Sequence, residues 1–476
     1  MRKTLLALAL TVAFPAAFAQ MAANNTIELY GIVDVGAEFI DNGTSTNILG
    51  QKNDITINRI TSGISTGSRW GIRGREDLGG GYAAIFTLES RFEVDTGRVQ
   101  NNGATFVCST ANVGTQSVTS CPGVGLAYQL PPQTPPAQLA AIVAGNNAVN
   151  ALGANLVSTV NGVDALFDRQ AYAGLITPFG AIIAGRQYTP GYEMFVKYNS
   201  FFDSFAGNPG QITAINLRAN NALQYRAELK GFTLSAMYGF GGAEGVAGGR
   251  SERVAVSNGD DFWGINLQYA TPNFGVAGAY QQNRTVTFAK QTENQKGLET
   301  YQVGAWVGFG SLKFYGQYLH SENDNPVVTP TDIQNLVVAN ANNPNAVASI
   351  TSTLLSQYIN RWDVNGLRGV VGPTDLDVYH LGLEWTFQTG RLLFAYNHAE
   401  DSSRSPWATA DANVDSFGLA YYYYLSKRTW LYAAGAYANN KDQARIALGA
   451  ACCVGGWTGN FGEDSRNIQI GMRHTF

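Results

Sequence analysis

The chain has 476 residues, of which 45% are hydrophobic, 12% aromatic and only 14% charged. This charged fraction is well below the roughly 25% of an ordinary soluble domain. Beyond the first residues, however, no run of about 18 apolar residues occurs, which excludes membrane-spanning helices. The formal net charge of -4 leaves no basic footprint for nucleic acid.

Residues 1–19 are typical of an export signal. Arg2 and Lys3 give a charged start, Leu5 to Phe14 form an apolar stretch, and Ala17-Phe18-Ala19 supplies a small-residue cleavage site. The apolar stretch is too short to cross a bilayer. We therefore expect residues 1–19 to be a cleaved signal peptide and residues 20–476 to form a single exported domain.

After this segment, apolar and polar side chains alternate with a period of two, which predicts β-strands with one apolar and one wet face. Near the start, Leu29 and Val33 share one face, whereas Tyr30 and Asp34 share the other. About sixteen segments of this kind occur. The predicted strands cover residues 26–38, 68–76, 82–94, 167–177, 180–188, 220–229, 232–241, 260–271, 275–284, 298–308, 311–320, 376–387, 391–399, 412–424, 428–438 and 465–476.

The connections between these strands alternate strictly between tight turns and long polar loops. Glycine and proline supply the turn dihedrals, as in Thr177-Pro178-Phe179-Gly180. Short turns then lie at one end of the sheet and loops at the other, as in outer-membrane barrels. The predicted long loops are 39–67, 95–166, 189–219, 242–259, 285–297, 321–375, 400–411 and 439–464.

The two strand faces predict lipid on one side and water on the other. Trp385 and Trp430 lie near strand ends, as in the aromatic girdle of a membrane barrel. Asn266, Gln302 and Arg473 lie on the opposite faces, where a dry interior would leave them without partners. The predicted fold is all-β: a 16-stranded antiparallel transmembrane β-barrel with short periplasmic turns and long extracellular loops around a water-filled lumen.

Several segments resemble Gram-negative general porins. Residues 26–36 look like the first strand of that family, 68–81 are similar to the second strand and first turn, and 471–476 resemble the C-terminus. The resemblance covers nearly all of the mature chain and is weakest in the long loops. It implies a homotrimer in outer-membrane lipid, with each barrel a diffusion pore for small hydrophilic solutes and ions. It also implies that Phe476 is a signal for the barrel-assembly machinery.

The resemblance further implies that the third long loop, 189–219, folds inward as the pore constriction. Its acids are Glu193 and Asp203, and its bases are Lys197 and Arg218. Ser204 stands where many relatives carry an acid, so the loop is sparse in carboxylates. We therefore expect a constriction dominated by arginine, with a weak to moderate preference for anions.

The wall that faces this loop is expected to carry arginines. Arg186 shares its strand face with the apolar Ile182 and Ala184, so a lumenal position requires a β-bulge nearby. The expected wall residues are Arg69 and Arg186, and strand alternation adds Arg73, Arg75 and Arg91.

Four cysteines lie in loop-like sequence. Export to an oxidising compartment favours a disulfide between Cys108 and Cys121. The adjacent Cys452 and Cys453 could form a vicinal disulfide or remain two thiols. No histidine lies near either pair in sequence, so we expect no metal site there and no cofactor.

Three histidines are candidate catalytic residues, because some barrels could be enzymes. His320, His380 and His398 lie near the loop-side ends of successive strands. Alternation places His380 on the lumenal face and the other two on the apolar face. Side chains on opposite faces of a wall cannot form one acid–base site, so we expect no enzymatic activity.

Two other functions remain open. The first is a channel selective for one small solute, such as a sugar, a carboxylate or an aromatic compound. Tyr192, Tyr198, Phe201 and Phe202 of the third long loop could form a partial aromatic slide for such a solute. The second is a passive adhesin or scaffold barrel, which would conduct ions poorly.

Overall fold

The computed structural model describes most of the predicted strand regions and parts of the loops. The predicted signal peptide and all four cysteines lie outside the described residues. The described residues are 25–46, 52–97, 99, 109–113, 116–120, 166–240, 243–245, 261–285, 295–323, 374–402, 412–441, 444, 446–449, 458 and 462–476.

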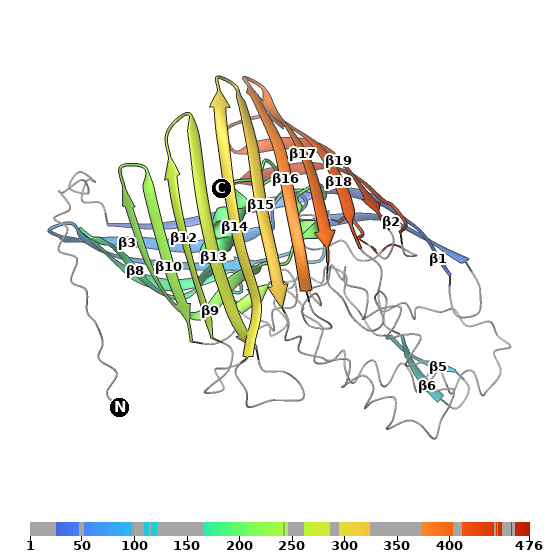
Figure 1. Cartoon of the computed structure of the whole chain (residues 1–476), viewed down its shortest axis with the longest axis horizontal. Helices are drawn as coiled ribbons and strands as arrows, with labels where there is room; N and C mark the ends of the chain where they lie inside the picture. Colours follow the sequence, from blue (N-terminus) through green and yellow to red (C-terminus); the bar gives the residue numbers. More distant parts are fainter. Residues whose placement is uncertain are drawn as a thin grey trace.

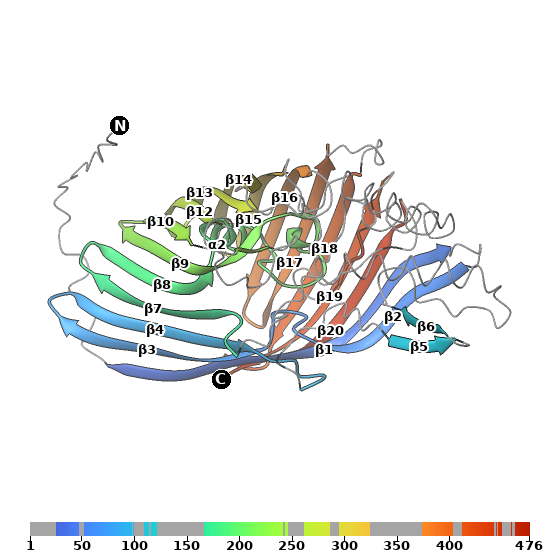
Figure 2. The same cartoon turned by 90° about the horizontal axis from the view of Figure 1, so that it is seen from below.

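A single antiparallel sheet curls into a closed ring (Figures 1 and 2). The ring closes where the last strand, β20, pairs with β1 from Ile32↔Thr475 to Asp41↔Arg466. Eighteen segments form the sheet. Two pairs of segments lie end to end: β2 and β3 along β1, and β10 and β11 along β9. The chain is therefore a 16-stranded antiparallel β-barrel, as predicted.

The barrel strands are β1 (Thr26–Thr46), β2 (Lys52–Ser62), β3 (Arg69–Gly79), β4 (Tyr82–Arg91), β7 (Gln170–Thr177), β8 (Gly180–Tyr188), β9 (Asn216–Leu229), β10 (Phe232–Gly239), β11 (Ala243–Gly245), β12 (Phe262–Ala270), β13 (Phe274–Thr285), β14 (Gln295–Phe309), β15 (Leu312–Asn323), β16 (Thr374–Phe387), β17 (Gly390–Asp401), β18 (Val414–Tyr424), β19 (Thr429–Asn440) and β20 (Ser465–Thr475). A separate two-stranded sheet consists of β5 (Ser109–Val113) and β6 (Gln116–Ser120).

The largest difference from the predicted strands concerns the first long loop. The sequence predicts a loop over 39–67, but β1 continues to Thr46 and β2 already begins at Lys52. Both extensions are rich in Asp, Asn and Thr. A strand that projects into water has no lipid on either face, so it need not alternate apolar and polar residues. The missing period hid these strands in the sequence.

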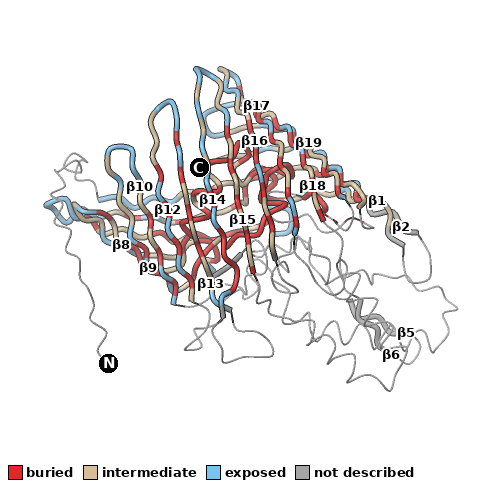
Figure 3. Tube along the Cα trace, viewed as in Figure 1, coloured by how far each residue is buried: buried red, intermediate tan, exposed pale blue. Residues whose placement is uncertain are grey.

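The predicted alternation of an apolar outer face and a polar inner face is confirmed. The predicted place of Trp430 in the outer aromatic girdle is wrong, however, because Trp430 pairs with Arg473 across the strands and packs on its guanidinium on the lumenal face. Leu267, Val303 and Leu381 point outward and are 54%, 57% and 61% exposed, whereas the inward-facing Asn266 and Gln302 are 1% and 2% exposed. Figure 3 shows buried and exposed residues alternating along the strands. The barrel therefore presents an apolar surface to its surroundings and a polar one to its interior.

Two short helical segments belong to the loop between β8 and β9. Helix α2 (Pro190–Lys197) packs against the inner side of β12, β13 and β14, and the 3-10 helix η1 (Pro209–Ile212) contacts β16 (Figure 2). None of the helices among the described residues has the length and apolar character that a membrane crossing requires.

Removal of Phe476 tests the closure of the ring. The backbone N–H and C=O of Phe476 both bond to Gly31, at 3.1 Å each. Because a net backbone hydrogen bond contributes about 1 kcal/mol, we expect deletion of Phe476 to lower the free energy of unfolding by about 2 kcal/mol. Urea unfolding in detergent micelles, followed by tryptophan fluorescence, measures this change. Phe476→Tyr keeps the backbone and serves as the control; an equal loss in both variants would contradict the prediction.

Candidate functional site

The loop between β8 and β9, residues 189–215, lies inside the barrel and is called the inward loop. Its helix α2 begins where the Thr189 hydroxyl accepts a hydrogen bond from Tyr192 N at 3.2 Å, with Pro190 in the first turn. Lumenal amides hold this helix start. Asn266 donates to Pro190 O at 2.6 Å, and Gln302 donates to Gly191 O at 2.7 Å.

The far end of the inward loop is held in the same way. Ser200 N donates to His380 Nε2 at 3.1 Å, and Ala206 N donates to Gln469 Oε1 at 3.2 Å. The sequence predicts that the lumenal amides face water. The structure instead buries Asn266, Gln302 and Gln469 under the inward loop, because their hydrogen-bonding groups are the partners of its backbone. The prediction that these amides lie on the lumenal side is correct, but they bind the inward loop instead of water.

A second inward segment, residues 63–68, interrupts the wall between β2 and β3. It turns at Gly63, which has a φ of +76°. Phe205 N of the inward loop donates to Ile64 O at 3.0 Å. Ser65 N donates to Asp34 Oδ1 at 3.2 Å, and the hydroxyls of Ser65 and Tyr422 lie 2.7 Å apart. The inward loop is thus clamped between the wall and this segment.

An arginine cluster lies on the inner wall around Glu89 and is called the Glu89 cluster. Arg169 Nε donates to Glu89 Oε1 at 2.8 Å, and Arg69 Nη1 lies 3.8 Å from the same oxygen. Arg169 and Arg218 both donate to the hydroxyl of Tyr188, at 2.7 and 3.5 Å. Two guanidinium groups therefore share the Glu89 carboxylate, and Arg218 joins the cluster through Tyr188 at the start of the inward loop.

The structure brings some of the predicted site residues together and separates others. Arg69 and Arg218 meet in the Glu89 cluster. Arg91 is buried and forms an ion pair with Asp168 at 3.1 Å. Arg73 is paired with Glu28 at 2.8 Å, nearer the tight-turn end of β3. Arg75, one step further along the same face, lies opposite Thr26 and Ile85.

Arg186 lies at an irregularity, as a lumenal position requires. The register between β8 and β9 shifts from Gly185 to Gln187. On its other side, however, Arg186 pairs with Ala171, which pairs with the apolar Leu88. Its guanidinium donates to Asp168 O at 2.6 Å and to Asn220 Oδ1. These contacts hold Arg186 against the wall and do not support its prediction as a constriction residue.

The two acids of the inward loop are both engaged. Glu193 pairs with Arg226 of β9 at 3.1 Å, and Asp203 accepts a hydrogen bond from Tyr192 Oη at 3.0 Å. The aromatic slide that the sequence suggests does not form as such. Tyr192, Tyr198 and Phe201 are only 5%, 0% and 0% exposed, because they pack the loop against the wall.

Sequence reasoning missed several lumenal cations. Arg226, Lys313 and Arg391 share strand faces with Gln224, Gln317 and Asn397, which are buried on the lumenal side. Strand alternation alone would have identified these three. Arg169 precedes β7 and reaches Glu89 through an irregular backbone, so no period in the sequence marks it.

A model of the Gram-negative porin family matches residues 5–443 of the chain. The chain belongs to this family. An outer membrane porin protein of Bordetella pertussis is 25% identical over the full length of both chains, and outer membrane porin protein 32 of Delftia acidovorans is 24% identical, also over the full length of both. The protein is therefore an outer-membrane porin channel and not an enzyme.

Solved structures share the fold of this porin. An anion-selective porin from Comamonas acidovorans is 18% identical, with a TM-score of 0.58 over 95% of this chain and 100% of that one. The trimer form of OmpT, an outer membrane protein of Vibrio cholerae, is 13% identical, with a TM-score of 0.54 over 95% of this chain and 99% of that one.

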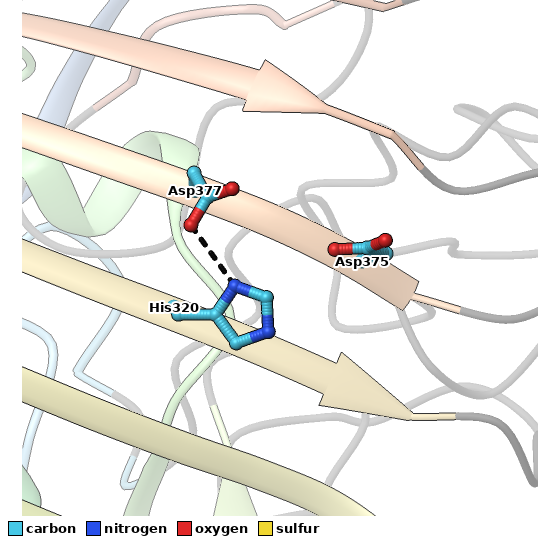
Figure 4. Close-up of side chains that lie close together, drawn as sticks. All are labelled: His320, Asp375 and Asp377. Carbon is cyan, nitrogen blue, oxygen red and sulfur yellow. Dashed lines mark hydrogen bonds and ion pairs between the residues drawn. The ribbon is translucent and has the colours of Figure 1, made fainter.

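The histidines of the porin lie as the alternation predicts. His380 is buried on the lumenal side, 2.6 Å from Asn397 Oδ1. His320 lies on the outer face, 2.9 Å from Asp377 Oδ1 and near Asp375 (Figure 4). The same Asp377 oxygen also accepts a hydrogen bond from Tyr318 Oη at 2.5 Å. The outer group is therefore a hydrogen-bonded strand contact that is separated from the channel by the wall.

Substitution of Gly418 tests the contact between the inward loop and the barrel wall. A Cβ at Gly418 would lie 2.8 Å from Gly207 Cα and 2.9 Å from the Phe201 ring. We expect Gly418→Ala to displace the loop, to change single-channel conductance in a planar bilayer and to lower the free energy of unfolding by about 1–3 kcal/mol. Gly316→Ala is the matched control, because no atom lies within 4 Å of the added Cβ. Equal conductance in the two variants would contradict the prediction.

Proposed function

We propose that this porin is a passive diffusion channel for small hydrophilic solutes and ions with a preference for anions. The Glu89 cluster carries the proposal. Arg69 and Arg169 share the single carboxylate of Glu89, which supports an excess of positive charge beside the inward loop. Positive charge at a narrow point raises the local concentration of anions and opposes cations.

The inward loop adds only two carboxylates to this field, and Lys197 of the same loop offsets part of their charge. The Glu193 carboxylate is paired with Arg226, and the Asp203 carboxylate is bonded to Tyr192. The other cations described on the lumenal wall include Lys313, Arg391 and Arg473, as the alternation of their strands indicates. The anion-selective porin of similar fold is consistent with the same preference here.

The assembly of the porin belongs to the same proposal. We infer a homotrimer in outer-membrane lipid, delivered by the barrel-assembly machinery with Phe476 as its signal. The support is the family resemblance together with the trimeric form of one structure of similar fold. Chemical cross-linking of the protein in native membranes tests the trimer.

Reversal potentials in a tenfold KCl gradient test the ion preference. We expect the porin to favour chloride and Arg69→Gln to lower the chloride-to-potassium permeability ratio about twofold, since one lumenal charge is lost. Lys427→Gln removes an exposed cation from a tight turn outside the lumen and should leave the ratio unchanged. A clear potassium preference in the unmodified protein would overturn the proposal.

The ion preference should also depend on pH through Glu193. Burial raises the pKa of Glu193 above its ordinary value of 4.5, although Arg226 and Lys197 oppose this shift and Glu228 adds to it. As the pH falls, Glu193 therefore gains a proton before an ordinary glutamate does, and the charge of Arg226 is then less compensated. When the pH is lowered from 7 toward 4.5, we expect the chloride preference to increase.

The variant Glu193→Gln provides the comparison for this pH dependence. It should already show a higher chloride preference at pH 7, and acidification should change its reversal potential less than that of the unmodified protein. Superimposable pH profiles in the two proteins would show that Glu193 does not contribute.

A further inference from the structure

Cations and aromatic rings lie in contact along the lumenal wall from β14 to β18. Lys313 Nζ lies 3.9 Å from the ring centre of Trp306 and 4.8 Å from that of Tyr315. Arg391 Cζ lies 4.6 Å from the ring centre of Tyr422. Each cation therefore has a ring face at cation–π distance.

Phe202 of the inward loop connects these contacts. Its ring centre lies 6.4 Å from that of Tyr315 in an edge-to-face arrangement and 5.3 Å from Arg391 Cζ. Phe202 has a positive φ of 58°, a conformation that is uncommon for an aromatic residue. The inward loop thus presents one ring toward the wall cations while its neighbour Phe201 is fully buried.

The contacts continue to the last strands of the barrel. Trp430 packs edge to face on Tyr422 at 5.6 Å, and Arg473 Cζ lies 4.7 Å from the ring centre of Trp430. We call this series the cation–aromatic band; its members with surface open to the lumen are Trp306, Lys313, Phe202, Arg391, Trp430 and Arg473.

The band lies on the inner face of the wall. Trp306 is two residues from Gly304, where an added Cβ would meet Tyr198 of the inward loop at 2.8 Å. Tyr315 and Tyr422 are only 4% and 0% exposed and lie behind the members of the band. The band is therefore a partly exposed surface on a rigid support, which is the usual construction of a binding site.

The band carries three cations, and two carboxylates of the wall lie opposite them. Glu384 lies 3.4 Å from Arg391, pairs across the strands with Lys313 and accepts a hydrogen bond from Tyr315 Oη at 2.8 Å. Asp34 pairs across the strands with Arg473 and accepts a hydrogen bond from Tyr432 Oη at 2.8 Å. Within the described part of the chain, Lys313 and Arg473 contact aromatic rings and have no carboxylate oxygen within 4.0 Å. An anion in the lumen would therefore meet Lys313 and Arg473 beside ring faces, without first having to break a direct ion pair.

We propose that the cation–aromatic band is a binding subsite for aromatic carboxylates. The carboxylate would pair with Arg391, Arg473 or Lys313, while its ring packs on Trp430, Phe202 or Trp306. An aliphatic carboxylate keeps the charge contact and apolar packing but lacks the interaction between aromatic rings, and an aromatic amine meets like charge. This proposal rests on the anion-preferring channel proposed above and names the solute class that such a channel would retain longest.

The test compares three solutes of similar size: benzoate, cyclohexanecarboxylate and benzylamine. Each is added to single channels conducting KCl in a planar bilayer, and the concentration that half-saturates the change in KCl current is measured. We expect this concentration to be about two- to tenfold lower for benzoate than for cyclohexanecarboxylate, because only benzoate adds an aromatic–aromatic interaction to its apolar packing. Benzylamine should have little effect.

Two sets of variants locate the effect. Trp430→Leu and Phe202→Leu should bring the benzoate value close to that of cyclohexanecarboxylate, while KCl conductance persists. Arg226→Gln removes a lumenal cation whose described ion pairs are to Glu193 and Glu228, away from the band. It should lower chloride preference and leave the ratio between benzoate and cyclohexanecarboxylate unchanged.

The outcomes separate the two proposals. Equal half-saturation by benzoate and cyclohexanecarboxylate in the unmodified porin overturns the subsite, even if no variant folds. Retention of the benzoate effect in Trp430→Leu and Phe202→Leu also overturns it. Absence of KCl conductance, or a potassium preference, would instead overturn the proposed channel function itself.

Discussion

Hydrocarbon offers no hydrogen-bond partners, so every backbone N–H and C=O of a lipid-facing strand must bond within the protein. A sheet meets this requirement only when it closes, and here closure depends on β20 pairing with β1. The closed wall sorts the side chains into an apolar outer face and a polar inner face. The remaining properties of the porin follow from the contacts that these polar side chains make inside the barrel.

The polar side chains inside the barrel have two roles: some bind the inward loop, and others carry charge. Amides and one imidazole, from Asn266 to Gln469, bind the backbone of the inward loop. The charged side chains form the Glu89 cluster and the cation–aromatic band. The first role fixes the position of the loop, and the second sets the field that a solute meets. The loop brings few acids to this field, and those it has are engaged by Arg226 and Tyr192.

The two-residue period was sufficient to predict the barrel, its strand number and the lumenal side of residues such as Gln302 and His380. It failed where lipid no longer constrains the strand, as in the polar extensions of β1 and β2. It also could not show that Asn266 and Gln469 bind a loop, because the period assigns a face and not a partner. Arg169 and Arg186 lie at backbone irregularities, where the period itself breaks down.

The segment at 63–68 links the inward loop to the first and last strands of the barrel. The inward loop bonds to Ile64, which stands beside Asp34 of β1, and to Gln469 of β20. Tyr432 Oη of β19 also donates to Asp34, at 2.8 Å. A barrel in which the first and last strands have not yet paired therefore lacks some of the contacts that hold the inward loop. The inward loop can therefore reach its final position only in a finished barrel.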